Sequence, residues 1–130
     1  MVDPGPSPSL PTLLEKIEAA GLDARELRHL VLTHIHLDHA GATGELVARF
    51  PKLTVHVHVD GAPYLVDPER LVASTRRTFG EAYDELYGAV RPVPADRIRV
   101  WRPREGAPVG GAGATTLRAL YAPGHIGHHL

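Results

Sequence analysis

The segment T-H-I-H-L-D-H-A-G, residues 33–41, brings together four side chains that bind metals: His34, His36, Asp38 and His39. It follows the apolar run Leu30–Leu32, which has the character of a buried strand. Side chains two residues apart in extended backbone point the same way, so His34 and His36 should project together from the end of this strand. Imidazole and carboxylate groups bind zinc, iron or manganese, and two-metal hydrolases hold their ions ~3.5–4 Å apart. The segment therefore predicts a site for one metal ion or for two neighbouring ions.

The composition restricts both the kind of site and the kind of protein. The chain has nine histidines but no cysteine, so a metal must be bound through nitrogen and oxygen atoms, and disulfides are excluded. Net charge is −1 and no basic run is present, which argues against a nucleic-acid partner. No apolar stretch reaches the about 20 residues of a membrane span, and the N-terminus does not resemble a signal peptide. A cytoplasmic protein without a membrane partner is expected.

Apolar periodicity, together with proline and glycine boundaries, predicts the elements that must position the site. Helical segments are expected at residues 10–20, 23–27, 44–50 and 68–87. Asp67 is predicted to cap the last of these with Pro68 at its first position, Gly80 to divide it, and Gly88 to end it. Strands are expected at residues 30–32, 53–60, 98–101 and 116–121, with a glycine-rich turn at 109–113 between the last two. This order suits one layered α/β domain over residues 1–130.

The segment 53–60, L-T-V-H-V-H-V-D, alternates apolar and polar residues along its whole length. Such alternation is typical of a strand with one buried and one polar face. The polar face carries His56 and His58, which are expected to be solvated or to support the site without binding the metal. His29 precedes the buried strand and needs no special role.

Three motifs together resemble the metallo-β-lactamase fold superfamily, in the broad hydrolase branch that includes glyoxalase II-like enzymes. T-H-I-H-L-D-H, from Thr33, is similar to the family motif H-x-H-x-D-H. V-D-P-G, from Val2, resembles the D-x-G element that precedes the family's first helix. Y-A-P-G-H-I-G-H-H, from Tyr121, resembles the later element T-P-G-H-x-x-G-H, whose first histidine is a metal ligand.

The resemblance implies a ligand set. His34, His36 and His125 would bind the first metal, while Asp38 and His39 would contribute to the second. Asp38 would also be the catalytic residue that helps to orient the attacking hydroxide. His129 falls where the family often has a supporting histidine, and His128 replaces the usual glycine without an evident reason.

The resemblance also implies the fold, a four-layer αββα sandwich of two similar halves, of which this chain corresponds mainly to the N-terminal half. The family supplies a bridging aspartate and a last histidine downstream of the third histidine, so residues 1–130 are expected to be an incomplete single domain. A homodimer, or the missing second half of the domain, is therefore the expected macromolecular partner.

The function implied is metal-dependent hydrolysis of a small-molecule ester, thioester or lactone by a metal-activated water. Zinc is the expected cofactor, up to two ions, with iron or manganese as alternatives. The isolated chain is expected to hydrolyse such substrates weakly or undetectably, because the second site lacks ligands. Two other readings stay open: a mononuclear iron dioxygenase of the same fold, and an inactive zinc-binding fragment. Aromatic residues of the region 68–87 are expected in the core, with the lining of a substrate pocket as the alternative: Phe79, Tyr83 and Tyr87.

Overall fold

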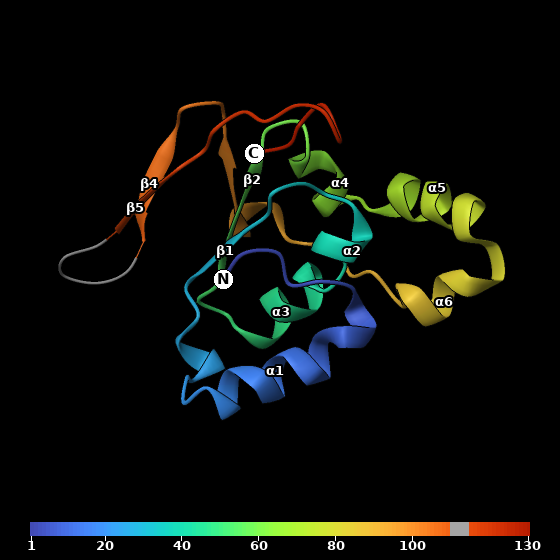
Figure 1. Ribbon diagram of the computed structural model, residues 1–130, viewed down its shortest axis with the longest axis horizontal. Coiled ribbons are helices and arrows are strands. Elements are labelled where there is room, and N and C mark those ends of the chain that lie inside the picture. Colours follow the sequence, from blue (N-terminus) through green and yellow to red (C-terminus); the bar gives the residue numbers. More distant parts are fainter. Residues whose placement is uncertain (110–114) are drawn as a thin grey trace.

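The computed structural model describes residues 1–109 and 115–130 and has the helices and strands shown in Figure 1. The α-helices are α1 (Leu10–Ala19), α2 (Leu37–Ala40), α3 (Thr43–Arg49), α4 (Ala62–Val66), α5 (Glu69–Phe79) and α6 (Tyr83–Leu86). Short 3-10 helices are η1 (Ser7–Ser9), η2 (Ala24–Glu26), η3 (Gly80–Ala82) and η4 (Ala95–Arg97). The strands are β1 (His29–Val31), β2 (Thr54–His58), β3 (Ile98–Trp101), β4 (Gly106–Val109) and β5 (Thr115–Arg118). The predicted glycine-rich turn lies, from residue 110 on, outside the described residues.

The central sheet has three parallel strands in the order β1-β2-β3. Leu30, Val55 and Ile98 lie side by side across it in register. The fully buried Leu30 and Val55 share a core with Leu10 of α1 and Leu46 of α3. Figure 1 shows these two helices together on one side of the strands. Parallel strands need crossover connections, and helices supply them between β1 and β2 and between β2 and β3, which confirms the predicted α/β class.

The first residues extend the sheet beside β1. Val2 forms a parallel bridge with Val31, and the backbone N–H of Asp3 donates to the carbonyl oxygen of Val31 at 3.0 Å. The amino terminus donates to the carbonyl oxygen of His29, also at 3.0 Å. This pairing places Asp3 at the carboxyl end of β1, beside the segment 33–41.

The second face of the sheet is covered, so the predicted alternative in which His56 and His58 are solvated is wrong, while the alternative in which they support the site stays a prediction. Their side chains are only 3% and 6% exposed. The ring of Trp101 lies 4.8 Å from that of His56, and the ring of His128 lies 6.3 Å from that of His58. A period of two identifies the two faces of a strand but cannot show what covers the polar one. Here Trp101 comes from the neighbouring strand β3 and His128 from the C-terminal segment, both far along the chain.

Among the α-helices and strands, α2, α4 and β4 were not predicted. Helices α2 and α4 are too short to show helical periodicity, and the sequence of β4, G-A-P-V, contains two residue types that are depleted in strands. Strand β4 pairs with β5 in an antiparallel hairpin that projects away from the sheet, opposite α5 and α6 (Figure 1). Because β5 ends at Arg118, the predicted strand at 116–121 extends too far toward the C-terminus.

The long helical region is divided as predicted. Gly80 lies between α5 and α6 with φ of +55°, and Gly88 follows α6 with φ of +60°, conformations that favour glycine. Pro68 is the N-cap of α5 rather than its first helical residue. The carboxylate of Asp67 accepts a hydrogen bond from the backbone N–H of Glu69 at 3.3 Å, so it still caps the first turn.

Within residues 1–109 and 115–130, no helix combines the length and apolar character that crossing a membrane requires. The cytoplasmic location stays a prediction, as does the interpretation of residues 1–130 as one incomplete domain.

Candidate metal centre

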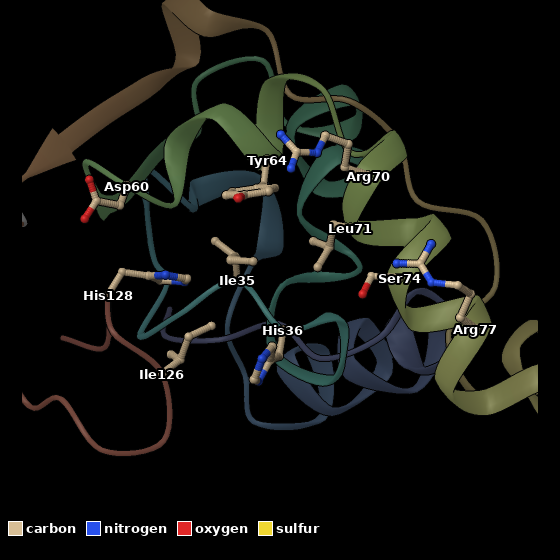
Figure 2. Close-up of a pocket in the computed structure, with 10 residues that line it drawn as sticks. All are labelled: Ile35, His36, Asp60, Tyr64, Arg70, Leu71, Ser74, Arg77, Ile126 and His128. Atoms are coloured by element: carbon tan, nitrogen blue, oxygen red, sulfur yellow. The ribbon is translucent and has the colours of Figure 1, made fainter.

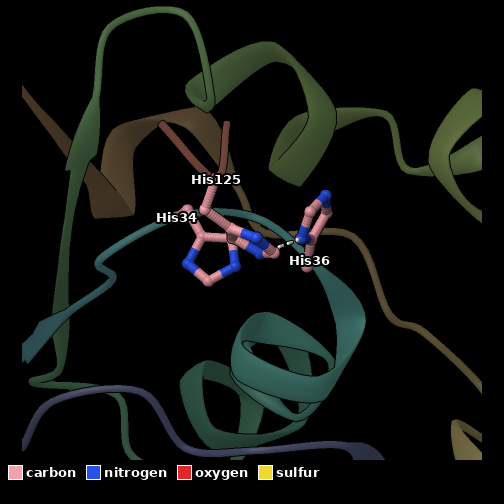
Figure 3. Close-up of side chains that lie close together, drawn as sticks. All are labelled: His34, His36 and His125. Atoms are coloured by element: carbon pink, nitrogen blue, oxygen red, sulfur yellow. Dashed lines mark hydrogen bonds between the residues drawn. The ribbon is translucent and has the colours of Figure 1, made fainter. Parts of the chain in front are cut away.

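Three histidines from two distant segments converge at the carboxyl end of β1. His34 and His36 follow this strand, and His125 reaches them from the C-terminal segment (Figure 3). Each offers one ring nitrogen, and these three atoms lie within 4.8 Å of one another. The backbone N–H of Leu130 donates to the carbonyl oxygen of Thr33 at 2.9 Å, which holds the C-terminal segment against the loop after β1. We refer to His34, His36 and His125 as the metal triad.

The tautomer of His34 is set by a relay from Asp3. The backbone N–H and the hydroxyl of Thr33 both donate to the Asp3 carboxylate, at 2.8 and 2.6 Å. A hydroxyl has one proton, so the Thr33 oxygen, 3.0 Å from His34 Nδ1, accepts from the Nδ1–H of that ring. The lone pair of His34 is therefore on Nε2, a buried atom without a hydrogen-bond partner among the described residues. An unsatisfied acceptor of this kind, facing two more imidazoles, suits a cation.

The second predicted pair lies beside the triad. His39 Nδ1 is 2.9 Å from the Asp3 carboxylate, so this nitrogen donates and the lone pair of Nε2 is left available. His39 Nε2 lies 3.5 Å from the carboxylate of Asp38, and its ring is 4.1 Å from that of His34. Gly5, with φ of +82°, fixes this loop by donating from its N–H to the carbonyl oxygen of His39 at 3.0 Å. Within the described part of the chain, no third ligand completes a group with Asp38 and His39.

The electrostatic environment favours uncharged imidazoles. Burial, assisted by the neighbouring histidines, lowers the pKa of His34 to about 4. Burial and the adjacent His125 also lower the pKa of His36. A neutral imidazole is the form that binds a metal. His36 Nδ1 and His125 Nε2 are 3.0 Å apart, comparable to the about 3.4 Å between two nitrogens on a tetrahedral zinc ion. The residues present therefore fit one divalent ion, although their roles as ligands stay predictions.

The last two histidines have different surroundings. The ring of His129 stacks on that of His34 with centroids 5.0 Å apart, a position that suits the predicted supporting role. His128 is buried, and burial lowers its pKa. It forms part of the wall of a pocket beside the triad, a place that the family motif did not predict.

Two hollows meet at His36. The first, which we call the arginine pocket, has a volume of about 470 Å³ and is lined by residues that include Ile35, His36, Tyr64, Arg70, Leu71 and Arg77 (Figure 2). The second, the aromatic pocket, has a volume of about 390 Å³ and is lined by residues that include His36, Asp38, Leu71, Phe79, Tyr87 and His125. Both pockets thus open on the metal triad, with α5 as their shared wall.

The aromatic residues of the helical region divide between core and pocket. Tyr83 and Tyr87 are 1% and 9% exposed and pack with Leu37, which confirms the predicted core role. Phe79 is 41% exposed and lies beside Tyr87 in the wall of the aromatic pocket. The lining residues Arg70 and Arg77 were not predicted; their spacing of seven residues on one helix was the available signal.

Comparison with known proteins agrees with this geometry. The family description "Metallo-beta-lactamase superfamily" matches residues 1–130. A metallo-beta-lactamase fold-containing protein of Sulfurisphaera tokodaii is 30% identical over 108 residues, 81% of this chain and 40% of the relative. The N-acyl homoserine lactonase AttM of Agrobacterium fabrum is 36% identical over 121 residues, 89% of this chain and 39% of the relative.

The structure has counterparts of the same kind. It superimposes on a mutant metallo-beta-lactamase from Cronobacter sakazakii with a TM-score of 0.70 and 27% identity, covering 98% of this chain and 45% of that protein. The chain thus spans less than half the length of each of these proteins, consistent with part of their sandwich fold. The family match covers all 130 residues, and the histidine triad lies at the end of β1 as in the family motif. The chain therefore belongs to the metallo-beta-lactamase superfamily.

Proposed function

We propose that this chain carries the metal-binding part of a hydrolase that cleaves an ester, thioester or lactone in a small molecule. The observation that carries the proposal is the convergence of His34, His36 and His125, with ligand atoms within 4.8 Å, at a junction of two pockets. Three neutral imidazoles with room for a fourth partner are typical of catalytic zinc sites. Zinc is accordingly the proposed metal, with iron or manganese as alternatives.

Among the three kinds of bond, a lactone has the most support. The relative from Agrobacterium fabrum, at 36% identity, is described as an N-acyl homoserine lactonase. The structurally similar protein from Cronobacter sakazakii is a metallo-beta-lactamase, named for another cyclic acyl substrate. A thioester, as in the glyoxalase II-like branch, rests on the motifs alone and ranks second.

Each residue of the site has a proposed task. The metal triad would hold the first ion, and Asp38 with His39 would contribute to a second. When bound, a divalent ion lowers the pKa of a water molecule toward neutrality and polarises a carbonyl oxygen. Asp38, whose side chain is 61% exposed beside His39, would orient the attacking water and accept a proton from it. Asp3 would keep His34 and His39 in the tautomers that turn Nε2 toward the ions.

The test is hydrolysis of an N-acyl homoserine lactone and a matched thioester by zinc-loaded protein, before and after chelation. We expect slow, metal-dependent turnover that His36→Ala abolishes and Asp38→Ala reduces. Turnover should be slow because residues 1–130 lack the family's bridging carboxylate and last histidine ligand, and the loss of one preorganised electrostatic group costs ~10²–10³ in rate. A longer chain that adds a bridging carboxylate and a further histidine ligand should be faster. Turnover that survives both chelation and His36→Ala would contradict the proposal.

The same preparations distinguish the alternatives. One iron per chain with oxygen consumption would favour a dioxygenase of this fold. If residues 1–130 and the longer chain both retain zinc but neither hydrolyses a substrate, the inactive zinc-binding alternative is favoured. A homodimer, or a second half of the domain, stays the proposed partner. The side chains of Leu120 and Tyr121 are 66% and 50% exposed, which is consistent with such an interface.

A further inference from the structure

Two arginines of α5 line the arginine pocket. Arg70 and Arg77 are seven residues apart, about two helical turns, so both lie on the same face of the helix. Both side chains are exposed, and neither makes an ion pair or side-chain hydrogen bond with the described residues. Arg76 behaves differently, because it pairs with Asp84 at 2.6 Å and lies 4.0 Å from the ring centre of Tyr83. The guanidinium groups of Arg70 and Arg77 are thus available to a ligand, whereas that of Arg76 is paired with Asp84.

The rest of the pocket wall is arranged around this positive side. Ile35 and Leu71 supply apolar surface between the arginines and His36, which belongs to the metal triad (Figure 2). Asp60, the acidic residue of the wall, lies across the pocket from the arginines together with His128 (Figure 2). Its carboxylate is 3.6 Å from Nδ1 of His58. A molecule that reaches from the triad toward α5 therefore meets apolar surface first and guanidinium groups next.

We propose that Arg70 and Arg77 recognise an oxyanion, a carboxylate or a phosphate, on the part of the substrate remote from the bond that is cleaved. This inference rests on the proposed function, because it takes the metal triad as the place of the reaction. It narrows the proposed substrates to esters, thioesters or lactones that also carry a carboxylate or a phosphate away from the reacting bond. An uncharged acyl chain would use the aromatic pocket instead and gain nothing from the arginines.

The physical basis is the shape and charge of the guanidinium group. Its planar fork donates two parallel hydrogen bonds to a carboxylate or phosphate, and it stays charged at any physiological pH. Because both arginines are exposed, water and salt weaken the attraction, so each should contribute modestly. About two- to fivefold in affinity per arginine is the expected range, and high salt should reduce it.

The test uses calorimetric titration of the zinc-loaded chain with three probes of similar length: glutarate, 3-phosphonopropionate and butyrate. Glutarate or 3-phosphonopropionate should bind more tightly than butyrate, and the tighter of the two identifies the preferred oxyanion. Arg70→Gln and Arg77→Gln should each weaken binding of the dianion about two- to fivefold and leave the affinity for butyrate unchanged. Arg70→Lys, which keeps the charge but loses the fork, should fall between wild type and Arg70→Gln. Arg76→Gln removes the same charge from the same helix and should leave all three affinities unchanged.

A second arm separates this inference from the proposed function. Metal-free wild type and the Arg70→Gln, Arg77→Gln double variant are titrated with the same dianions. If the chain retains no metal, the proposed function fails, but a dianion that binds wild type and not the double variant still supports the arginines as its receptor. The inference would be overturned if glutarate and butyrate bound with equal affinity. It would also be overturned if the double variant bound the dianions as tightly as wild type does, with or without metal. Thermal melting of each variant checks that the fold is intact.

Discussion

Two groups of histidines, each with one buried member, lie on or beside this small sheet, and they differ in what the nitrogens of the buried member face. His34 and His56 are 1% and 3% exposed, and burial lowers the pKa of each to about 4. Each also has one buried ring nitrogen without a partner among the described residues. His34, however, faces two further imidazoles of the metal triad. Nε2 of His56 instead lies 3.0 Å from Nδ1 of His29, and the ring of His56 packs against Trp101. We refer to His29 and His56 as the sheet pair.

The comparison shows that a depressed pKa and an unsatisfied nitrogen report burial, not function. Both groups have these properties, yet of the two only the metal triad brings three nitrogens, from two distant segments, to one point. Only the triad also has a carboxylate, Asp3, that fixes ring tautomers through Thr33. The candidate site is therefore identified by the convergence of three ring nitrogens and by the hydrogen bonds that orient the rings, and not by lowered pKa values.

The largest expected difference between the two groups is in metal content. Wild type should retain about one divalent ion per chain, and His36→Ala should retain none, because two imidazoles and water hold zinc far less tightly than three imidazoles. His56→Gln should leave the metal content unchanged, since the sheet pair lacks a third ligand. Elemental analysis after gel filtration measures this, with circular dichroism to confirm folding. Absence of metal from folded wild type, or its loss in His56→Gln, would show that the triad has been assigned wrongly.

Most of the triad could be predicted from the sequence, because its information is local. His34 and His36 follow an apolar strand with a spacing of two, and His125 has its own short motif. The state of His56 and His58 could not be predicted, since Trp101 and His128, which cover them, are distant in sequence and come close only in the fold. The same reason applies to the arginine pocket, which the loop after β1, α4, α5 and the C-terminal segment form together.

The fold shows the same division. The parallel core was predictable, because Leu30, Val55 and Ile98 occupy apolar segments with clear boundaries. The β4–β5 hairpin was not, since Gly106 and Pro108 carry no strand preference and β4 forms by pairing with β5. Pairing between segments, unlike periodicity within one, leaves no mark in a single sequence.

A smaller effect is expected when the support of the triad is altered rather than the triad itself. In Asp3→Asn one carboxylate oxygen becomes an amide N–H₂, which cannot accept the protons that Thr33 and His39 donate. One or both imidazoles should then lose their fixed tautomer, and metal affinity should fall about 10–100-fold. Competition against a chelator of known affinity measures the change. Asp23→Asn, at an exposed helix cap remote from the site, is the matched control and should bind metal as wild type does. Unchanged affinity in Asp3→Asn would mean that the relay is structural only.

The smallest expected effect belongs to the sheet pair and appears in the stability of the metal-free protein. His56 has its folded-state pKa lowered from 6.5 to about 4, chiefly by burial. Between these values the unfolded chain binds a proton that the folded chain does not, so the free energy of unfolding is highest above pH 6.5 and decreases as pH falls toward 4. From pH 7 to pH 5.5 this one group should contribute a loss of about 1 kcal/mol. His56→Leu removes the titrating group from the same buried position, so its stability should decrease less over that interval. Urea titrations at the two pH values, compared for wild type and the variant, measure the difference. The remaining decrease in His56→Leu would come mainly from His34, and a decrease identical to that of wild type would show that His56 does not resist protonation in the folded sheet.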